Sequence, residues 1–89
     1  MTAPVQIYTT DHCGYCVRAK MLLTKRNIAF DEIDVSTDDE KRAWLVKATG
    51  QRTVPQIFIH GTPIGGASEL HELDRSGELA RRLAVPQSA

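Results

Sequence analysis

Two cysteines separated by two residues, in the stretch His12-Cys13-Gly14-Tyr15-Cys16, constrain this chain more than any other feature. The motif follows a strand-like run, Val5 to Tyr8, and precedes Val17 to Asn27, which has the spacing of an amphipathic helix. A thiol at a helix N-terminus meets unpaired backbone N–H groups and the positive end of the helix dipole, and both favour the thiolate. In such pairs the pKa of the first cysteine falls roughly one to several units below the free value of about 8.5. Cys13 is therefore a candidate nucleophile and Cys16 a candidate resolving thiol.

The length and the charge balance bound the class of protein. A chain of 89 residues is near the size at which one core suffices, so we expect a single domain over residues 1–89. Both cysteines lie in the motif, which argues against a secreted disulfide scaffold and predicts a reducing, cytoplasmic location. The sequence has no apolar run long enough to span a bilayer, so no membrane association is expected. Lys plus Arg and Asp plus Glu are both 11, so we expect no nucleic-acid partner.

The middle of the chain predicts a second strand and a second helix. Ala29 to Val35 is typical of a strand, which a right-handed crossover would place parallel to the first. Thr37 to Glu40 has the capping-box pattern, so a helix is expected from there to Ala48, ended by Gly50. Trp44 and Ala48 are one turn apart and are assigned to its inner face. A ligand platform is the alternative for Trp44.

The last third predicts a hairpin and two helices. Gln56 to His60 is expected to be a strand, joined by a turn over His60 to Pro63 to a further strand at Ile64. Ser68 and Ser76 are predicted to be N-caps of two helices, and the tail Pro86 to Ala89 is expected to fray. The apolar residues assigned to the two helices are Leu70 and Leu73 in the first, and Leu79 and Leu83 in the second.

Each functional feature has a plainer alternative. A Cys-x-x-Cys pair also serves zinc sites, but zinc needs four ligands, and the three histidines are predicted to lie in a loop, a turn and a helix without ligand-like spacing: His12, His60 and His71. An inert structural pair is the other alternative, disfavoured by the position of the thiols before a helix.

Two further elements stay open on their spacing alone. Thr53-Val54-Pro55 precedes an apolar run, and Pro55 either starts a strand or is an ordinary loop proline. Gly65-Gly66 is either a plain turn or a place where the backbone approaches a ligand closely at a helix start.

In combination, these elements resemble a glutaredoxin of the dithiol class along almost the whole chain. The shared runs, in chain order, are Ile7-Tyr8-Thr9, Cys13-Gly14-Tyr15-Cys16, Ala19-Lys20, Leu22-Leu23, Thr53-Val54-Pro55-Gln56-Ile57-Phe58-Ile59 and Ile64-Gly65-Gly66. The resemblance implies an α/β, thioredoxin-like (glutaredoxin) fold, with a four-stranded mixed sheet flanked by helices and a cis peptide bond before Pro55. It also implies glutathione as the electron donor.

The resemblance assigns a role to each site residue. Cys13 is implied to attack a disulfide and become glutathionylated, and Cys16 to be its intramolecular partner. The implied glutathione-binding residues surround them. Tyr15 forms one wall, the segment Thr53-Val54-Pro55 pairs with the cysteinyl part as an added strand, and Gly66-Ala67-Ser68 holds the γ-glutamyl carboxylate. Lys47 and Arg52 are implied to lie near the glycyl carboxylate.

Three residues depart from the common family pattern. Thr10 stands where relatives often have Lys, Gly14 where they often have Pro, and Ser68 where they often have Asp. In some glutaredoxins a small residue at the place of Gly14 accompanies a [2Fe-2S] cluster, held between two protomers by the first cysteine and one bound glutathione of each.

The leading prediction is a monomeric, glutathione-dependent thiol–disulfide oxidoreductase that reduces protein disulfides and glutathione mixed disulfides through Cys13 and Cys16. One alternative is a thioredoxin-like reductant served by a flavoprotein reductase. The other is a module that binds or transfers a [2Fe-2S] cluster as a bridged dimer, with Cys13 as a ligand. No metal is expected in the monomer, and the expected partners are glutathione and proteins that carry disulfides or glutathionylated cysteines.

Overall fold

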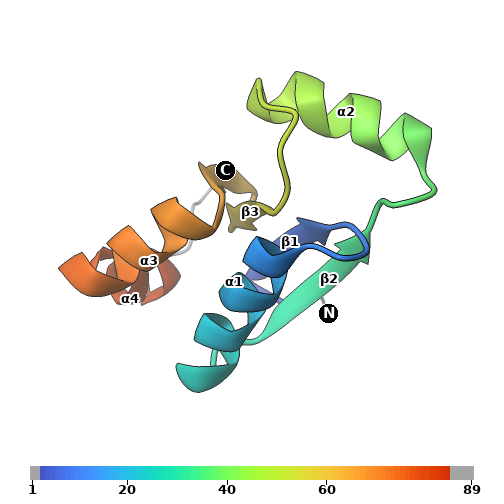
Figure 1. The fold of residues 1–89 in the computed structure, drawn as a ribbon. Helices are drawn as coiled ribbons and strands as arrows, with labels where there is room; N and C mark the ends of the chain where they lie inside the picture. The colour runs from blue at the N-terminus through green and yellow to red at the C-terminus, as the bar shows by residue number, and fades with distance from the viewer. Residues whose placement is uncertain (1–2, 85–89) are drawn as a thin grey trace.

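A computed structural model describes residues 3–84, so the fraying predicted for Pro86 to Ala89 lies outside the described residues. The strands and helices follow one another along the chain as β1 (Val5–Thr9), α1 (Gly14–Lys25), β2 (Phe30–Asp34), α2 (Asp39–Thr49), β3 (Gln56–Ile59), β4 (Thr62–Gly65), α3 (Ala67–Ser76) and α4 (Glu78–Ala84) (Figure 1). The strands form one sheet in the order β2-β1-β3-β4. β1 is parallel to β2 and antiparallel to β3, and β3 is antiparallel to β4. The predicted four-stranded mixed sheet is confirmed.

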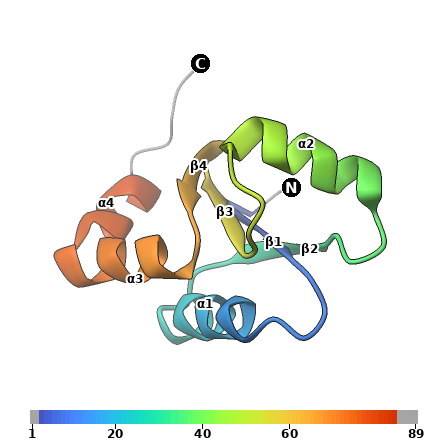
Figure 2. The same cartoon turned by 45° about the horizontal axis from the view of Figure 1, so that its top comes forward.

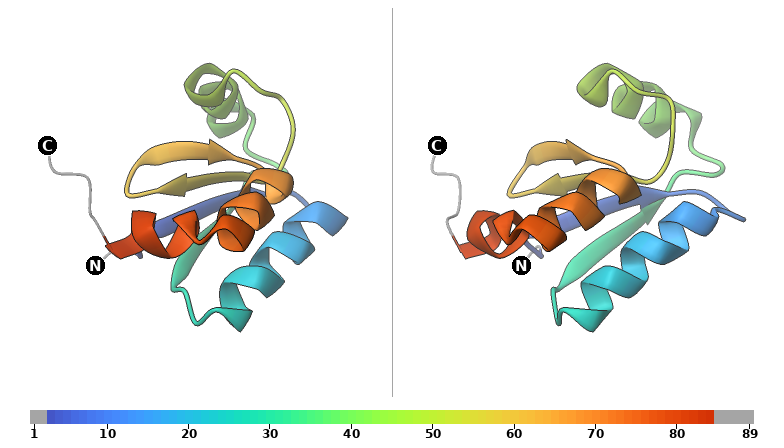
Figure 3. Two further views of the ribbon diagram at one scale, coloured as in Figure 1. Left: turned by 90° about the vertical axis from the view of Figure 1, so that its left-hand side faces the viewer. Right: turned by 60° about the vertical axis from the view of Figure 1, so that its left-hand side comes forward.

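Helices lie on both faces of this sheet. α1 and α3 lie side by side on one face and α2 lies on the other, as Figures 2 and 3 show from different directions. The main hydrophobic core fills the space between the sheet and the first of these layers. It contains Val5 and Ile7 of β1, Ile57 and Ile59 of β3, and the buried side chains Ala19, Leu22, Leu23, Ala67, Leu70 and Leu79 of the helices. Among residues 3–84, no helix combines the length and the apolar character that crossing a bilayer requires.

The opposite face of the sheet carries an aromatic cluster, and here the prediction for α2 is wrong. Trp44 is 48% exposed, and its ring lies 6.0 Å from Phe58 in a stacked arrangement and 5.6 Å from Tyr8. Ala48 is exposed, whereas Leu45 is buried. The inner face therefore centres on Leu45, one residue or about 100° around the helix from the predicted stripe. The Trp44 side chain lies at the edge of this inner face, with part of its ring on Tyr8 and Phe58 and part exposed.

Several helix ends differ from the prediction because side chains cap them at other positions. α1 begins at Gly14 rather than near Val17. The N-cap of α2 is Asp38 rather than Thr37, since the Asp38 carboxylate accepts the Lys41 backbone N–H at 3.0 Å. The predicted end of α2 at Gly50 is confirmed, and Gly50 takes the left-handed conformation at φ 73°.

The C-terminal helices show the same kind of correction. α3 begins at Ala67 with Gly66 as its N-cap, so the prediction of Ser68 as the cap is wrong. Ser76 is the last residue of α3, and its hydroxyl accepts the Glu78 backbone N–H at the start of α4. The predicted contact therefore exists, although Ser76 belongs to the preceding helix.

The second strand and the hairpin turn are shorter than predicted. β2 covers Phe30–Asp34 within the predicted 29–35. The β3–β4 turn consists of His60 and Gly61 alone, both with positive φ (49° and 83°), and Thr62 already belongs to β4. A tight two-residue turn with both φ values positive matches the twist of the strands that it joins.

Candidate active site

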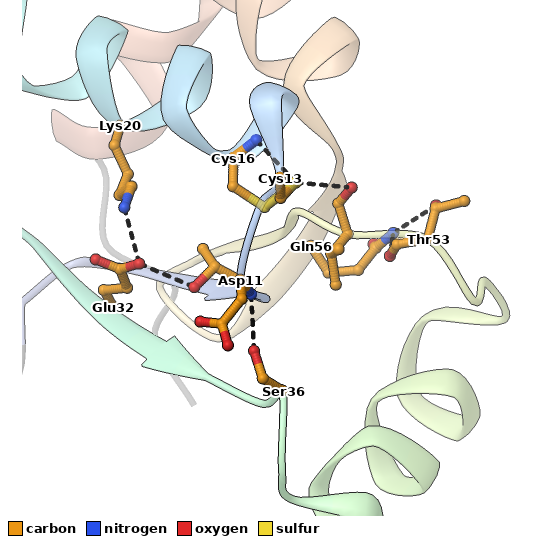
Figure 4. The surroundings of a disulfide bond; sticks show 10 residues. Asp11, Cys13, Cys16, Lys20, Glu32, Ser36, Thr53 and Gln56 are labelled. Atoms are coloured by element: carbon orange, nitrogen blue, oxygen red, sulfur yellow. Dashed lines mark hydrogen bonds and ion pairs between the residues drawn. A yellow bond between two sulfur atoms is a disulfide. The ribbon is translucent and has the colours of Figure 1, made fainter.

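The two cysteines lie at the start of α1 and are joined by a disulfide, with their Cα atoms 5.2 Å apart. Cys13 is the N-cap, and its sulfur accepts a hydrogen bond from the Cys16 backbone N–H at 3.1 Å. Cys16 is only 2% exposed, whereas Cys13 is half-buried. Figure 4 shows the pair at the end of the helix with this hydrogen bond between them. A reactant from solution therefore reaches Cys13 before Cys16.

The electrostatic surroundings of Cys13 favour a negative sulfur in the reduced protein. The first turn of α1 contains no acidic side chain, so the unpaired N–H groups and the helix dipole act without an opposing charge there. A hydrogen bond donated to a thiolate stabilises the charged form and lowers its pKa. The Cys16 N–H is in place to donate such a bond.

Hydrogen bonds to Ser36 fix the loop that leads into Cys13. The Asp11 backbone N–H donates to the Ser36 hydroxyl at 2.7 Å, and the Ser36 backbone N–H donates to the Asp34 carboxylate at 2.8 Å. The hydrogen bonds from Ser36 lower the pKa of Asp34 below its usual value. His12, directly before the cysteine, has a positive φ of 56°. The loop between β1 and α1 is thus tied to the end of β2.

A charged pair lies beside the disulfide. Lys20 Nζ lies 2.9 Å from Glu32 Oε2, and the Thr9 hydroxyl donates to the same oxygen at 2.9 Å (Figure 4). The hydrogen bond from Lys20 is the largest cause of a lowered Glu32 pKa, burial opposes it, and the bond from Thr9 adds to it. Lys20 and Glu32 line one pocket together with both cysteines.

The loop before β3 contacts the reactive sulfur. The Val54–Pro55 peptide bond is cis, as the resemblance implied, and the Val54 carbonyl oxygen lies 3.8 Å from the Cys13 sulfur. The side chain of Gln56, 1% exposed, fixes this loop. Its amide group donates to the Thr53 carbonyl oxygen at 2.9 Å and to Gln51 Oε1 at 3.1 Å.

The start of α3 completes the same surface. A Cβ at Gly66 would lie 3.1 Å from the Pro55 carbonyl oxygen, so only glycine leaves this approach of two backbones relaxed. The Gly66 backbone N–H donates to Glu69 Oε1 at 2.7 Å. Tyr15, 63% exposed, and Ser68 line one groove between α1 and α3. The structure therefore brings most of the predicted site residues onto one surface: Cys13, Tyr15, Thr53, Val54, Pro55, Gly66, Ala67 and Ser68.

Within the described chain, two predicted basic residues have no hydrogen bond or ion pair with this group. Lys47 is in the last turn of α2 and Arg52 is in the loop before Thr53, both exposed and without an ion pair to another described side chain.

Gly14, the first residue of α1, is exposed, and a Cβ there would meet no atom within 4 Å. Within residues 3–84, no three His, Cys, Asp or Glu side chains are arranged to hold a metal ion.

The sequence reasoning missed Gln56 and Glu69. Glu69 had a readable signal, since a helix N-cap followed three residues later by Glu is half of a capping box, and Gly66 and Glu69 have that spacing. Gln56 had no such signal in the sequence, because nothing about a polar residue at the start of a strand indicates that a loop will bury it.

The comparisons agree on one family. The family model called Glutaredoxin matches residues 5–64. A glutaredoxin of Pseudomonas aeruginosa is 49% identical over 82 residues, which are 92% of this chain and 98% of that protein. Glutaredoxin 3 of Escherichia coli K12 is 44% identical over 77 residues, which are 86% of this chain and 93% of that protein. The crystal structure of buckwheat glutaredoxin in complex with glutathione superposes with a TM-score of 0.86 at 35% identity, covering 92% of this chain and 77% of that one.

The geometry and the comparisons lead to the same class of chemistry. A half-buried cysteine at a helix N-terminus and a buried partner one turn later form a disulfide that thiols can open and close. Such a pair supports thiol–disulfide exchange. With Cys13 and Cys16 as its redox pair, the chain belongs to the glutaredoxin family.

Proposed function

We propose that this protein uses glutathione to reduce glutathione mixed disulfides and protein disulfides. The observation that carries the proposal is the meeting of three elements at Cys13: the start of α1, the Val54 carbonyl oxygen at 3.8 Å, and the start of α3, where Gly66 lies against Pro55. The Cys13 sulfur thus lies next to the Val54 backbone, and the N-terminus of α3 lies next to Pro55 in the same segment, an arrangement that suits a small acidic peptide.

Glutathione has groups that match each part of this surface. Its cysteinyl unit would pair with the backbone of Val54 as an added strand, which places its sulfur next to Cys13. Its γ-glutamyl carboxylate would accept the first-turn N–H groups of Ala67 and Ser68, because the Gly66 N–H is already bonded to Glu69. The Glu69 carboxylate at the same helix end is a partner for the γ-glutamyl ammonium.

The glycyl carboxylate of glutathione and the outer side of the bound peptide have no hydrogen-bond donor assigned so far. We place the glycyl carboxylate on the side of Arg52 and Lys47, exposed cations on the loop and helix before Thr53. Tyr15, beside Cys13, would cover the bound peptide from the other side. The likeness to buckwheat glutaredoxin in complex with glutathione supports this assignment.

The mixed-disulfide reaction needs only Cys13. Its thiolate attacks the glutathione sulfur of the substrate, so the Cys13–glutathione bond forms, the substrate thiolate leaves, and water protonates it. A second glutathione thiolate then attacks the bound glutathione sulfur, which releases glutathione disulfide and restores Cys13. Overall, one free glutathione is consumed: its sulfur leaves bonded to the glutathione sulfur of the substrate as glutathione disulfide, and the substrate is released as a thiol.

Protein disulfides require Cys16. Cys13 attacks one sulfur of the substrate disulfide and releases the other as a thiol, which leaves a mixed disulfide with the protein. Cys16 then attacks Cys13, releases the second thiol, and closes the Cys13–Cys16 disulfide, which two glutathione molecules reopen. The partners that we propose are glutathione and disulfide-bearing or glutathionylated proteins of a reducing compartment such as the cytoplasm.

The test supplies electrons from two sources. Turnover of the mixed disulfide of cysteine and glutathione is followed with glutathione and glutathione reductase, and in parallel with a flavoprotein thioredoxin reductase in place of both. The proposal predicts turnover with glutathione and little with the flavoprotein alone. Turnover with the flavoprotein alone would show a thioredoxin-like reductant instead.

A further inference from the structure

The groove between α1 and α3 extends beyond the residues that the proposed glutathione site uses, which are Tyr15, Ala67 and Ser68 at one end of it. It has a volume of about 710 Å³ and is lined along α1 by Tyr15, Arg18, Met21 and Lys25. These positions are spaced by three or four residues, so they follow one stripe of the helix. Met21 is 66% exposed, so its apolar side chain is accessible to a chain bound in the groove.

The groove begins at the end of α1 that carries the cysteines, and an ion pair between α1 and α3 stands at its other end. Tyr15 lies between the two cysteines in sequence, and Ser68 stands across from it at the start of α3. At the other end, the Arg26 guanidinium bonds both oxygens of Asp74 on α3, at 2.9 and 3.0 Å. At 1.5 Å per residue, the path from Tyr15 to Arg26 is ~16 Å long, which matches roughly five residues of an extended chain.

The charge of the groove selects for an acidic occupant. Arg18 and Lys25 have no ion pair with any side chain in the described part of the chain, while Asp74 is already neutralised by Arg26. The Arg18 guanidinium lies 5.9 Å from the centre of the Tyr15 ring, which holds one cation at the entrance next to Cys13. The groove therefore presents an exposed apolar side chain, Met21, between two cations, Arg18 and Lys25.

We infer that this groove binds the segment of a protein substrate that follows its reactive cysteine, and that it prefers an apolar residue flanked by acidic ones. The inference rests on the proposed function, because Cys13 must attack that cysteine. Tyr15, two residues after Cys13 in the first turn of α1, lines the groove, so a substrate chain that leaves Cys13 over Tyr15 would enter it. Binding there adds affinity for protein substrates only, since a glutathione mixed disulfide of cysteine is too short to reach Met21.

The test uses three peptides with the same Cys-x-x-Cys disulfide followed by five residues. The five residues contain leucine with glutamate, with glutamine, or with lysine. Wild-type protein is expected to reduce the glutamate peptide with a kcat/KM about threefold above the glutamine peptide and about tenfold above the lysine peptide, differences that shrink as salt screens the charges. Equal kcat/KM for the three peptides would overturn the inference.

Single substitutions then test which residues of the groove cause the preference among the three peptides. Lys25→Glu is expected to reverse the preference between the glutamate and lysine peptides, and Lys25→Gln, a milder change, to remove most of it. Met21→Ser is expected to lower kcat/KM for all three peptides. The matched control is Lys41→Glu on α2, an exposed lysine on the other face of the sheet. If Lys41→Glu changed the preference as much as Lys25→Glu, the effect would be one of net charge and the inference would be wrong.

The small substrate separates this inference from the proposed function. All these variants are expected to turn over the mixed disulfide of cysteine and glutathione within about twofold of the wild-type rate. Absence of that turnover in the wild type would refute the proposed function itself, whereas normal turnover without peptide preference would refute only the groove. The other candidate occupant of the groove is a second copy of this chain, and sedimentation of the wild type and of Met21→Ser tests for it. If the wild type is a dimer and Met21→Ser is a monomer, the groove is a contact between copies and the inference is wrong.

Discussion

The backbone nitrogen of Cys16 lies 3.1 Å from the sulfur of Cys13 and donates a hydrogen bond to it. Cys13 is the N-cap of α1 and Cys16 is in its first turn, so the donor that bonds the sulfur and the thiol proposed to resolve the intermediate belong to one residue, Cys16. The geometry therefore distinguishes the two cysteines: Cys13 is the more accessible and accepts this hydrogen bond, while Cys16 is buried.

The first prediction concerns the acidity of Cys13. In the reduced Cys16→Ser variant, which leaves a single thiol, the pKa of Cys13 is expected to lie at least about one unit below the free value of about 8.5. Thr10 supplies no positive charge, so the helix N-terminus and the backbone N–H at position 16 provide the effect. Thiolate absorbance against pH measures it. A midpoint near about 8.5 would show that the helix terminus is insufficient.

The second prediction concerns acid stability. The pKa of Glu32 is held below its usual 4.5 in the folded protein, mainly by the hydrogen bond from Lys20. A carboxyl whose folded pKa is depressed stabilises the protein above its unfolded pKa, and this contribution disappears as the pH falls through the folded pKa. Because the Glu32 side chain is 38% exposed, solvent screening limits the contribution to about 0.5 kcal/mol.

Urea unfolding of a double-mutant cycle tests this contribution. Lys20→Met and Glu32→Gln are expected to show a coupling energy at pH 7 that declines as the pH falls through the lowered pKa of Glu32 and its carboxyl takes up a proton. A coupling energy that stays constant from pH 7 to pH 3 would mean that the ion pair is not its origin.

The third prediction assigns Gln56 a positioning role. Gln56→Ala removes the donor that holds Thr53 and Gln51, so it is expected to lower the free energy of unfolding by about 1–3 kcal/mol. It is also expected to raise KM for a glutathione mixed disulfide, while the Cys13 pKa stays as in the wild type. Gln6→Ala is the matched control, because the Gln6 amide donates one hydrogen bond, to Ala3, away from the site. If both variants raised KM equally, Gln56 would have no specific role.

The order of the elements and the redox pair were readable from the sequence because they depend on local patterns. Alternating and helical spacing locate the strands and helices, and a Cys-x-x-Cys before a helix identifies the dithiol. The cis bond before Pro55 came from the family resemblance rather than from spacing. It is confirmed in the structure.

The errors arise where two local patterns compete or where a contact is distant in sequence. Thr37 and Asp38 are adjacent capping residues, and only the backbone conformation decides that Asp38 caps α2. Trp44 and Leu45 are adjacent apolar residues, and the packing of α2 on the sheet decides that Leu45 is buried. The role of Gln56 depends on how the loop before β3 folds back over it, which no spacing in the sequence encodes.

The fourth prediction concerns the cluster-binding alternative, which rests on Gly14. A bridged dimer needs Cys13 and one glutathione from each copy to converge on a [2Fe-2S] cluster, and glycine leaves the loop free to present the sulfur outward, whereas proline fixes φ near about −65°. If the alternative is right, anaerobic reconstitution with iron, sulfide and glutathione yields a coloured dimer that Cys13→Ser abolishes and Gly14→Pro weakens. Size-exclusion chromatography with visible detection measures this, and a colourless wild-type monomer would rule the alternative out.

The most direct measurement is the turnover of a small glutathione mixed disulfide, with glutathione and its reductase, by the wild type and the two cysteine variants. Cys13→Ser is expected to abolish turnover, because the only accessible thiolate is lost. Cys16→Ser is expected to retain much of it, because a second glutathione releases the intermediate without the buried thiol. Substantial activity in Cys13→Ser would contradict the assignment of Cys13 as the attacking residue.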